Sequence, residues 1–236
     1  MLDRLEKAFE LQKGFVSNAS HELRTPLTSM KGHIEITLKK ERDIKEYVET
    51  LQLLSDEVEN LNKISNNLLQ LAMATTDITS LKLKNVRVDE ALFSGKEDIL
   101  KTFPNYKVTI EFLTLPENEL LLSIFGNEQL IKSAFYNLIE NACKYSENKE
   151  AEISFKVFNG MIELIFKDKG IGIPQDEIAK IFQPFYRASN SRNITGSGLG
   201  LSLTKKIVEL HKGNITINSL LNIGTDIQIV FPSVTS

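Results

Sequence analysis

Hydrophobic residues in the N-terminal part of the chain recur at alternating steps of three and four residues, which is a heptad pattern. The first run, from Leu2 to about Lys39, has seam positions Leu2, Leu5, Phe9, Val16, Ala19, Leu23 and Met30, and Gln12 and Pro26 fill the remaining positions of the seam. The second run follows a charged turn at residues 39–43 and has Tyr47, Leu51, Leu54, Val58, Leu61 and Leu68, with Ser65 interrupting the pattern. A heptad pattern predicts helices that pack along one seam. We therefore predict a hairpin of two long helices.

A hairpin of only two helices leaves apolar surface uncovered. A second copy of the same hairpin can cover that surface across a two-fold axis, which produces a four-helix bundle. We therefore expect this part of the chain to form a homodimer.

The pattern changes at residues 74–80, where small and polar residues predict a break. Beyond this break, alternating apolar and polar positions predict strands, and amphipathic stretches predict helices. The expected strands are residues 107–113, 151–158, 161–168, 214–219 and 226–231, and the expected helices are 128–146 and 200–212. Because the strands follow one another in pairs, we expect a mixed sheet with helices on one face. The predicted domains are a helical hairpin at 1–75, a linker at 76–80 and an α/β domain at 81–236.

The composition is that of a soluble globular protein. Of the 236 residues, 42% are hydrophobic and 25% are charged. The net charge of −3 provides no broad positive surface, so we do not expect nucleic acid as a partner. The single cysteine, Cys143, excludes a disulfide within the chain and fits a reducing compartment. No apolar run approaches the roughly 18 residues that cross a bilayer, and the N-terminal residues are too charged for a secretory signal.

His21 lies two residues after the seam position Ala19, so the heptad register places its imidazole on the outward face of the first helix. A neutral imidazole is a nucleophile, and a neighbouring carboxylate such as Glu22 can orient it and accept a proton. Thr25 shares a face with His21, where its hydroxyl could hold a water molecule or a phosphoryl oxygen. A lone histidine on a coiled coil is more often an ordinary surface residue, so spacing alone leaves both interpretations open.

Pro26 falls inside the first heptad run. Proline removes a backbone hydrogen bond and clashes with the preceding turn, at a cost of about 3 kcal/mol in a helix interior. It therefore marks either the end of a helix or a kink within one. Because the heptad pattern resumes at Met30, we favour a kink that lets the segment around His21 move.

Three polar residues share one face of the helix expected at 128–146. Asn137, Asn141 and Lys144 are four and three residues apart, and Glu140 lies close to the same side. Two amide oxygens and a cation suit a hydrated Mg²⁺ ion and phosphate oxygens, because Mg²⁺ keeps several water ligands. Taken alone, the stripe is more simply explained as a polar outer face.

A first glycine cluster follows the strand expected at 161–168. Asp168 is followed by Gly170 and Gly172, which permit the close approach of a flat ligand. The Asp168 carboxylate can accept a hydrogen bond from an exocyclic amine. A lone motif of this kind is more often a turn than a site.

A second glycine cluster, Gly196, Gly198 and Gly200, leads into the helix expected at 200–212. The free N–H groups and the dipole of a helix N-terminus favour phosphate. The loop that precedes this cluster, residues 181–194, is rich in Asn, Ser and Arg and has the character of a mobile lid.

The segment FVSNASHELRTPLTS at 15–29 resembles the phosphoacceptor segment of sensor histidine kinases with the pattern His-Glu-x-x-Thr-Pro. The resemblance implies that His21 accepts the phosphoryl group and that Glu22 assists proton removal. It also implies that Thr25 places the water molecule when the protein dephosphorylates its partner.

The order and spacing of the polar stripe, both glycine clusters and the lid resemble the ATP-binding domain of histidine kinases, which is related to the gyrase, Hsp90 and MutL ATPases. The implied fold is a helical hairpin that dimerises into a four-helix bundle, followed by an α/β sandwich of this type. The resemblance implies that Asp168 binds the adenine amine and that Asn137 and Asn141 hold Mg²⁺. The implied phosphate contacts are Lys144 and the turn Gly198, Leu199 and Gly200, and Tyr145 and Arg187 match positions that also approach the nucleotide.

The resemblance implies an ATP-dependent histidine autokinase that passes the phosphoryl group to an aspartate of a response-regulator receiver domain. One alternative is an ATPase of the gyrase and Hsp90 type, but those enzymes have a water-activating glutamate where this chain has Asn137. Another is a dimeric scaffold with a decayed pocket, which the intact glycine clusters disfavour. The implied location is cytoplasmic, as part of a membrane-anchored sensor that reaches the membrane only through segments absent from this chain.

Overall fold

The computed structural model describes residues 2–75 and 82–234, and the chain divides into two compact units, residues 1–69 and 70–236. The linker predicted at residues 76–80 lies outside the described residues. None of the helices in the described ranges has the length and apolar character that a membrane span requires.

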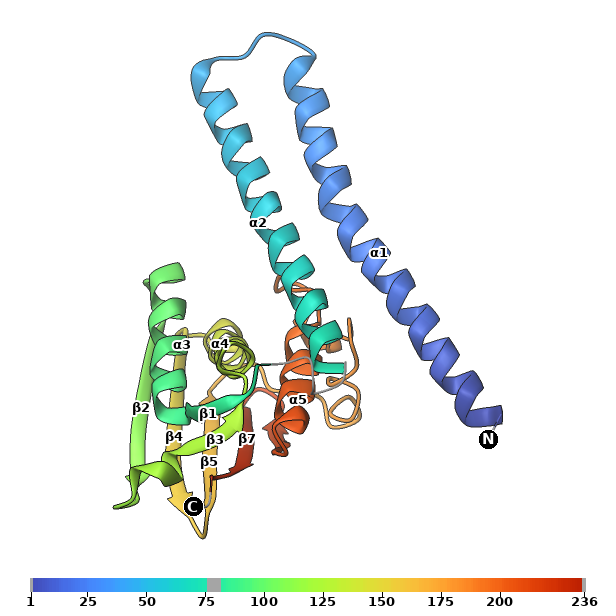
Figure 1. The fold of residues 1–236 in the computed structure, drawn as a ribbon. Helices are drawn as coiled ribbons and strands as arrows, with labels where there is room; N and C mark the ends of the chain where they lie inside the picture. The colour runs from blue at the N-terminus through green and yellow to red at the C-terminus, as the bar shows by residue number, and fades with distance from the viewer. Residues whose placement is uncertain (1, 76–81, 235–236) are drawn as a thin grey trace. The chain divides into compact units, whose positions relative to one another are not determined.

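The first unit contains α1 (Leu2–Leu38) and most of α2 (Ile44–Thr75), two long helices joined by a short turn (Figure 1). The hairpin predicted from the heptad pattern is therefore confirmed. Several apolar seam residues remain exposed in the single chain, with Val16 at 57%, Leu51 at 64% and Val58 at 47%.

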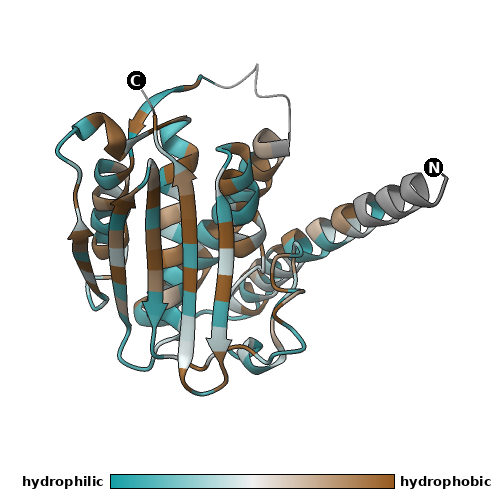
Figure 2. Cartoon of the chain, turned by 90° about the horizontal axis from the view of Figure 1, so that it is seen from below, coloured by the Kyte–Doolittle hydropathy of each residue, from teal (hydrophilic) through white to brown (hydrophobic). Residues whose placement is uncertain are grey.

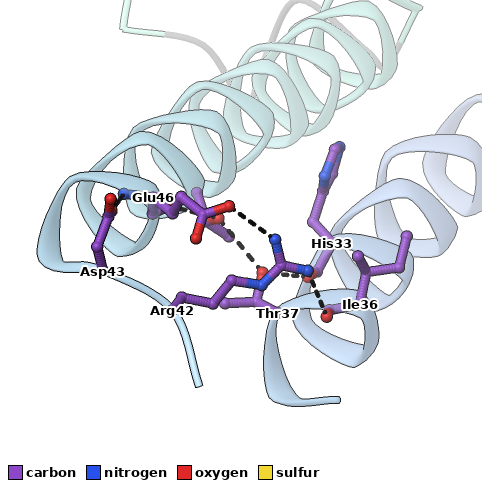
Figure 3. A network of polar contacts seen from close by, with 7 residues as sticks. His33, Ile36, Thr37, Arg42, Asp43 and Glu46 are labelled. Atoms are coloured by element: carbon purple, nitrogen blue, oxygen red, sulfur yellow. Dashed lines mark hydrogen bonds and ion pairs between the residues drawn. The ribbon is translucent and has the colours of Figure 1, made fainter. Parts of the chain in front are cut away.

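Two residues of the turn fix the ends of these helices. Asp43 caps α2, because its Oδ1 accepts a hydrogen bond from the Glu46 N–H at 2.7 Å. The Arg42 guanidinium donates to the Ile36 carbonyl at 3.1 Å and to Glu46 Oε1 at 2.9 Å, and so joins the end of α1 to the start of α2 (Figure 3).

α1 continues as one helix through Pro26, so the interpretation of Pro26 as a helix end is wrong. Pro26 is itself buried, whereas the residues on either side of it are exposed. The hydroxyl of Thr25 donates to the His21 carbonyl at 3.1 Å, and the hydroxyl of Thr28 donates to the Arg24 carbonyl at 2.9 Å. Hydrogen bonds of this kind often bend helices, and the kink at Pro26 stays a prediction.

In its described residues, the second unit contains the end of α2, a five-stranded sheet in the order β2-β4-β5-β7-β6, a two-stranded sheet of β1 and β3, and the helices α3, α4 and α5. In chain order the elements are β1 (Lys84–Arg87), α3 (Val88–Thr102), β2 (Lys107–Thr114), η2 (Glu119–Leu122), β3 (Ser123–Gly126), α4 (Glu128–Tyr145), β4 (Glu150–Phe158), β5 (Met161–Asp168), η3 (Ser189–Ser191), α5 (Gly200–Leu210), β6 (Asn214–Leu220) and β7 (Gly224–Pro232). Only the β2–β4 pair is parallel among the pairs of the five-stranded sheet. The predicted mixed sheet is confirmed, whereas α3, β1 and β3 were not predicted.

The core of this unit lies between the five-stranded sheet and its helices. Figure 2 shows apolar and polar segments alternating along the strands, with helices behind the sheet. Phe155 and Phe166 project from the strands into the core, where the ring centroids of Phe135 on α4 and Phe166 lie 5.9 Å apart. Each of these three side chains is at most 2% exposed. The sheet therefore supports α4, the helix that carries the predicted polar stripe.

Candidate functional site

His21 is an exposed residue on α1, as the heptad register predicts. Glu22 beside it is half-buried, and Thr25 is exposed one turn further along the helix. The imidazole is therefore accessible to a reactant from solution. The Thr25 hydroxyl is bound to the His21 carbonyl, which places Thr25 Oγ1 beside the backbone of the histidine.

Asn137 occupies a buried position on α4, with 6% of its surface exposed. Its side-chain nitrogen has no hydrogen-bond partner among the described residues. A buried donor without a hydrogen-bond partner lowers the stability of the fold by about 1–3 kcal/mol, so a group of this kind indicates that a ligand binds there. Asn141 and Lys144, on the same face, are half-buried. An acceptor oxygen of a phosphate or of a metal-bound water would satisfy the Asn137 amide.

The N-terminus of α5 lies against the polar stripe. A Cβ atom at Gly200 would lie 3.7 Å from Asn137 Oδ1, and a Cβ atom at Gly196 would lie 3.3 Å from Lys144 Nζ. Leu199 is fully buried at the N-cap position of α5 and provides no side-chain cap. The first N–H groups of α5 therefore keep donors available beside a lysine and an asparagine, which favours an anion.

Asp168 ends β5 beside the first glycine cluster. Its Oδ1 accepts a hydrogen bond from the Gly170 N–H at 2.9 Å. A Cβ atom at Gly170 would lie 2.2 Å from the Tyr145 carbonyl oxygen, so this loop packs directly on the end of α4. Gly172 has a φ of +62°, which glycine adopts without strain. Gly170 is therefore required by the close packing of the loop, and Gly172 by its positive φ.

Burial raises the pKa of the Asp168 carboxyl from 3.8 to about 6, because desolvation disfavours the charged form. Backbone N–H donors of Gly170 and Thr225 act against this shift. Burial also raises the pKa of the Tyr145 hydroxyl, and Tyr145 lies beside Lys144, whose Nζ is 6.0 Å from the ring centroid. A half-buried carboxylate held by backbone donors is suited to recognise a polar group of a ligand.

The Arg187 side chain forms hydrogen bonds with backbone carbonyls of the lid, residues 181–194. One of its nitrogens, Nη2, donates to the carbonyls of Ser191, at 2.7 Å, Arg192, at 3.2 Å, and Ile194. Arg187 therefore organises the lid itself in this structure, and an approach to nucleotide stays a prediction. The lid also connects to the second glycine cluster, because the Phe185 N–H donates to the Gly198 carbonyl at 3.0 Å.

Within the second unit, the structure thus brings together the polar stripe of α4, both glycine clusters and Asp168. His21, Glu22 and Thr25 belong to the first unit, so they form a separate group. Among the described residues, no three His, Cys, Asp or Glu side chains cluster as a metal site. A metal ion at the stripe would therefore take amide, phosphate and water oxygens as ligands.

Sequence reasoning missed two residues that shape the loop at 169–175, Asn190 and Ser219. Asn190 donates from its side chain to the Gly172 carbonyl at 2.9 Å, and Ser219 Oγ accepts from the Ile173 N–H at 2.9 Å. Both residues are far from this loop in sequence and carry no local motif. The only available signal was the richness of the lid in amide side chains.

Comparison with known protein families resolves which class of protein this arrangement represents. The model of the His Kinase A (phospho-acceptor) domain matches residues 11–77. The model of the histidine kinase-, DNA gyrase B- and HSP90-like ATPase matches residues 126–235. The chain belongs to the sensor histidine kinase family. The matched ranges include His21 in the first model and all of the predicted nucleotide residues in the second.

Two curated relatives of this histidine kinase chain come from staphylococci. It is 33% identical over 235 residues to the signal transduction histidine-protein kinase ArlS of Staphylococcus haemolyticus, covering 98% of this chain and 51% of that protein. The values for ArlS of Staphylococcus aureus strain USA300 are the same. The chain therefore spans about half the length of the curated relatives it matches.

Solved histidine kinases share the fold. The Acinetobacter baumannii histidine kinase AdeS matches with a TM-score of 0.65 and 22% identity, over 91% of this chain and 98% of that one. Histidine kinase ThkA, in a structure with the response regulator protein TrrA, has a TM-score of 0.65 and 21% identity, over 97% of this chain and 64% of that one. At these identities the likeness establishes the fold, a helical hairpin followed by the mixed α/β domain.

Proposed function

We propose that this chain is an ATP-dependent histidine autokinase that phosphorylates His21. The single observation that carries the proposal is an exposed histidine, in the pattern His-Glu-x-x-Thr-Pro, in the same chain as a domain of the histidine kinase ATPase family. His21 Nε2 forms a bond to the γ-phosphorus while the bond from that phosphorus to ADP breaks. Glu22 accepts the proton that leaves the imidazole.

The nucleotide pocket lies between α4, α5 and the loop at 169–175. Asp168 accepts a hydrogen bond from the adenine amine, and Gly170 and Gly172 leave room for the ring. Lys144 and the N–H groups of Gly198, Leu199 and Gly200 bind phosphate oxygens, as the geometry at the start of α5 supports.

Asn137 and Asn141 would hold Mg²⁺, whose role when bound is to neutralise charge on the phosphates. The partnerless amide nitrogen of Asn137 supports a ligand at this position. Asn137 provides no carboxylate to activate water, so hydrolysis of ATP should be slow and the γ-phosphate is retained for His21. An ATPase of the gyrase type would require a different residue here.

We also propose that the chain acts as a homodimer and transfers the phosphoryl group to an aspartate of a response-regulator receiver domain. The exposed apolar seam of α1 and α2 supports the dimer. The relative ThkA is known in a structure with a response regulator, which supports a partner of this class.

Incubation with ATP labelled at the γ-phosphate tests the autokinase. The intact chain should acquire an acid-labile, base-stable label, and His21→Gln should abolish it. His33→Gln is the matched control, because His33 lies on the same helix and should not affect labelling. Asn141→Ala should strongly reduce labelling. Equal labelling of the His21→Gln and His33→Gln variants would disprove the proposal, and ATP turnover without label on His21 would favour the ATPase alternative.

A further inference from the structure

Two segments on the surface of the second unit are joined by hydrogen bonds. One is the loop at 169–175 with the first glycine cluster, which we call the base-side loop. The other is the lid, residues 181–194. The side-chain amide of Asn190, in the lid, donates to the Gly172 carbonyl at 2.9 Å and to the Ile171 carbonyl at 3.4 Å. Beside it, Glu177 Oε2 accepts from the Ser189 N–H at 2.9 Å.

The base-side loop is also bound by the hairpin of β6 and β7. Ser219, which is 1% exposed, accepts from the Ile173 N–H at 2.9 Å through its hydroxyl. The Ser219 carbonyl accepts from Gln175 Nε2 at 2.6 Å, and the Asn222 N–H donates to the Ile171 carbonyl at 2.9 Å. The hydrogen bond from Asn190 therefore joins the lid to a loop that several other hydrogen bonds hold in place.

The lid is also hydrogen-bonded to the glycine turn before α5, where we propose that the phosphates bind. Arg187 binds three carbonyls of the lid, which makes the segment from 187 to 194 internally ordered. The Phe185 N–H donates to the Gly198 carbonyl at 3.0 Å, so the start of the lid is tied to the glycine turn before α5. Gly198 has a φ of +71°, and a Cβ atom there would lie 2.7 Å from the Phe185 carbonyl carbon, so the two segments are in close contact.

We propose that Asn190 is a positioning residue for nucleotide binding. Its amide ties the lid to the base-side loop and so holds the turn at Gly198 in place for the phosphates while the base occupies the other end of the pocket. This inference rests on the proposed nucleotide site. Asn190 is exposed, so its bond should contribute little to the stability of the fold and mainly to the position of the lid.

The test compares Asn190→Ala, Asn190→Asp and the matched control Asn193→Ala, an exposed asparagine of the same lid. Asn190→Ala should raise the KM for ATP about five- to tenfold, the effect of one lost hydrogen bond, with kcat within about twofold. Asn190→Asp should raise KM further, because a carboxylate cannot donate to the Gly172 carbonyl and is repelled by it. Asn193→Ala should leave both parameters unchanged.

Two further measurements on the intact chain do not depend on phosphoryl transfer. Calorimetric titration with ADP should show weaker binding for Asn190→Ala. Trypsin should cut after Arg192, an exposed lid residue, several-fold faster in Asn190→Ala than in Asn193→Ala, with Tm within about 3 °C of the parent chain.

The inference is overturned if Asn190→Ala and Asn193→Ala have equal KM, equal ADP affinity and equal cleavage rates. It is also overturned if a fall in Tm accounts for the loss of binding. If the parent chain takes up no label on His21 but Asn190→Ala alone weakens ADP binding, the inference stands and the autokinase proposal fails.

Discussion

At the scale of single residues, the burial of the Asp168 carboxyl group has a consequence for the stability of the fold. Its pKa is raised by burial from 3.8 to about 6, so the folded chain holds this proton more tightly than the unfolded chain does. The associated stability is present below pH 3.8 and is lost as the pH rises to about 6. At pH 8 a half-buried ionised carboxylate therefore opposes folding.

Asp168→Asn should consequently raise the free energy of unfolding at pH 8, on the order of 1–2 kcal/mol, and should abolish ADP binding. Urea denaturation and calorimetric titration measure the two effects. Asp176→Asn, at an exposed carboxylate, should change neither. A less stable Asp168→Asn variant, or one that binds ADP normally, would contradict this account of the carboxyl group.

His211 is a buried histidine whose neutral imidazole forms hydrogen bonds with the backbone of both Asn127 and Ile207. Its Nε2 accepts from the Asn127 N–H at 2.9 Å, and its Nδ1 lies 2.6 Å from the Ile207 carbonyl, which requires a proton on Nδ1 only. Burial lowers its pKa below 6.5. The unfolded chain therefore binds this proton more readily, and stability should be lost as the pH falls through about 6.5.

His211→Gln should be less stable than the parent chain at pH 8 but should lose less stability between pH 8 and pH 5.5. The difference between the two pH profiles isolates His211, because Asp168 titrates in both proteins. Urea denaturation at each pH gives the profiles. Parallel profiles would show that His211 does not titrate on unfolding.

At the scale of elements, α5 contains a group that its packing leaves unsatisfied. Thr204 is 0% exposed, and its hydroxyl has no partner among the described residues. Thr204→Val keeps the shape and removes the buried hydroxyl, so it should stabilise the chain by about 1 kcal/mol. Thr204→Ser keeps the hydroxyl and removes a methyl group, so it should destabilise. Thermal unfolding of the pair should show Tm shifts of opposite sign.

The elements also show which parts of the fold a sequence can reveal. The long helices and the five strands of the main sheet were predictable because their apolar positions alternate over many residues. α3 was missed because Gly95 lies in its interior, where glycine normally disfavours a helix. In the structure a Cβ atom at Gly95 would lie 3.5 Å from Phe135 Cβ, so the glycine serves close packing against α4. β1 and β3 have four residues each, too few to show alternation.

The candidate site likewise contains residues that the sequence could place together and contacts that it could not predict. Asn137, Asn141 and Lys144 could be placed together because helical spacing alone brings them to one face. The bond between Asn190 and Gly172 joins residues 18 apart, and that between Ser219 and Ile173 joins residues 46 apart. No local pattern encodes such contacts, since they depend on how the loops and the hairpin fold around one another.

At the scale of the whole molecule, the hairpin of α1 and α2 exposes apolar side chains along its seam, and exposed apolar patches mark interaction surfaces. Leu51, Val58 and Val16 are each about half exposed or more in the single chain. Burial of such a seam against a second copy would contribute roughly 25 cal/mol for each Å² of apolar surface removed from water. The hairpin should therefore be stable mainly as part of a dimer.

Leu51→Glu should place a charge on this seam and convert the dimer to monomer, with a loss of helical signal as the hairpin loses its partner. Gln52→Glu is the matched control, because it adds the same charge at the neighbouring exposed position and should leave the dimer intact. Light scattering after size-exclusion chromatography measures the mass, and circular dichroism measures helicity. If the parent chain is monomeric, or if both variants remain dimeric, the apolar seam does not form a dimer interface.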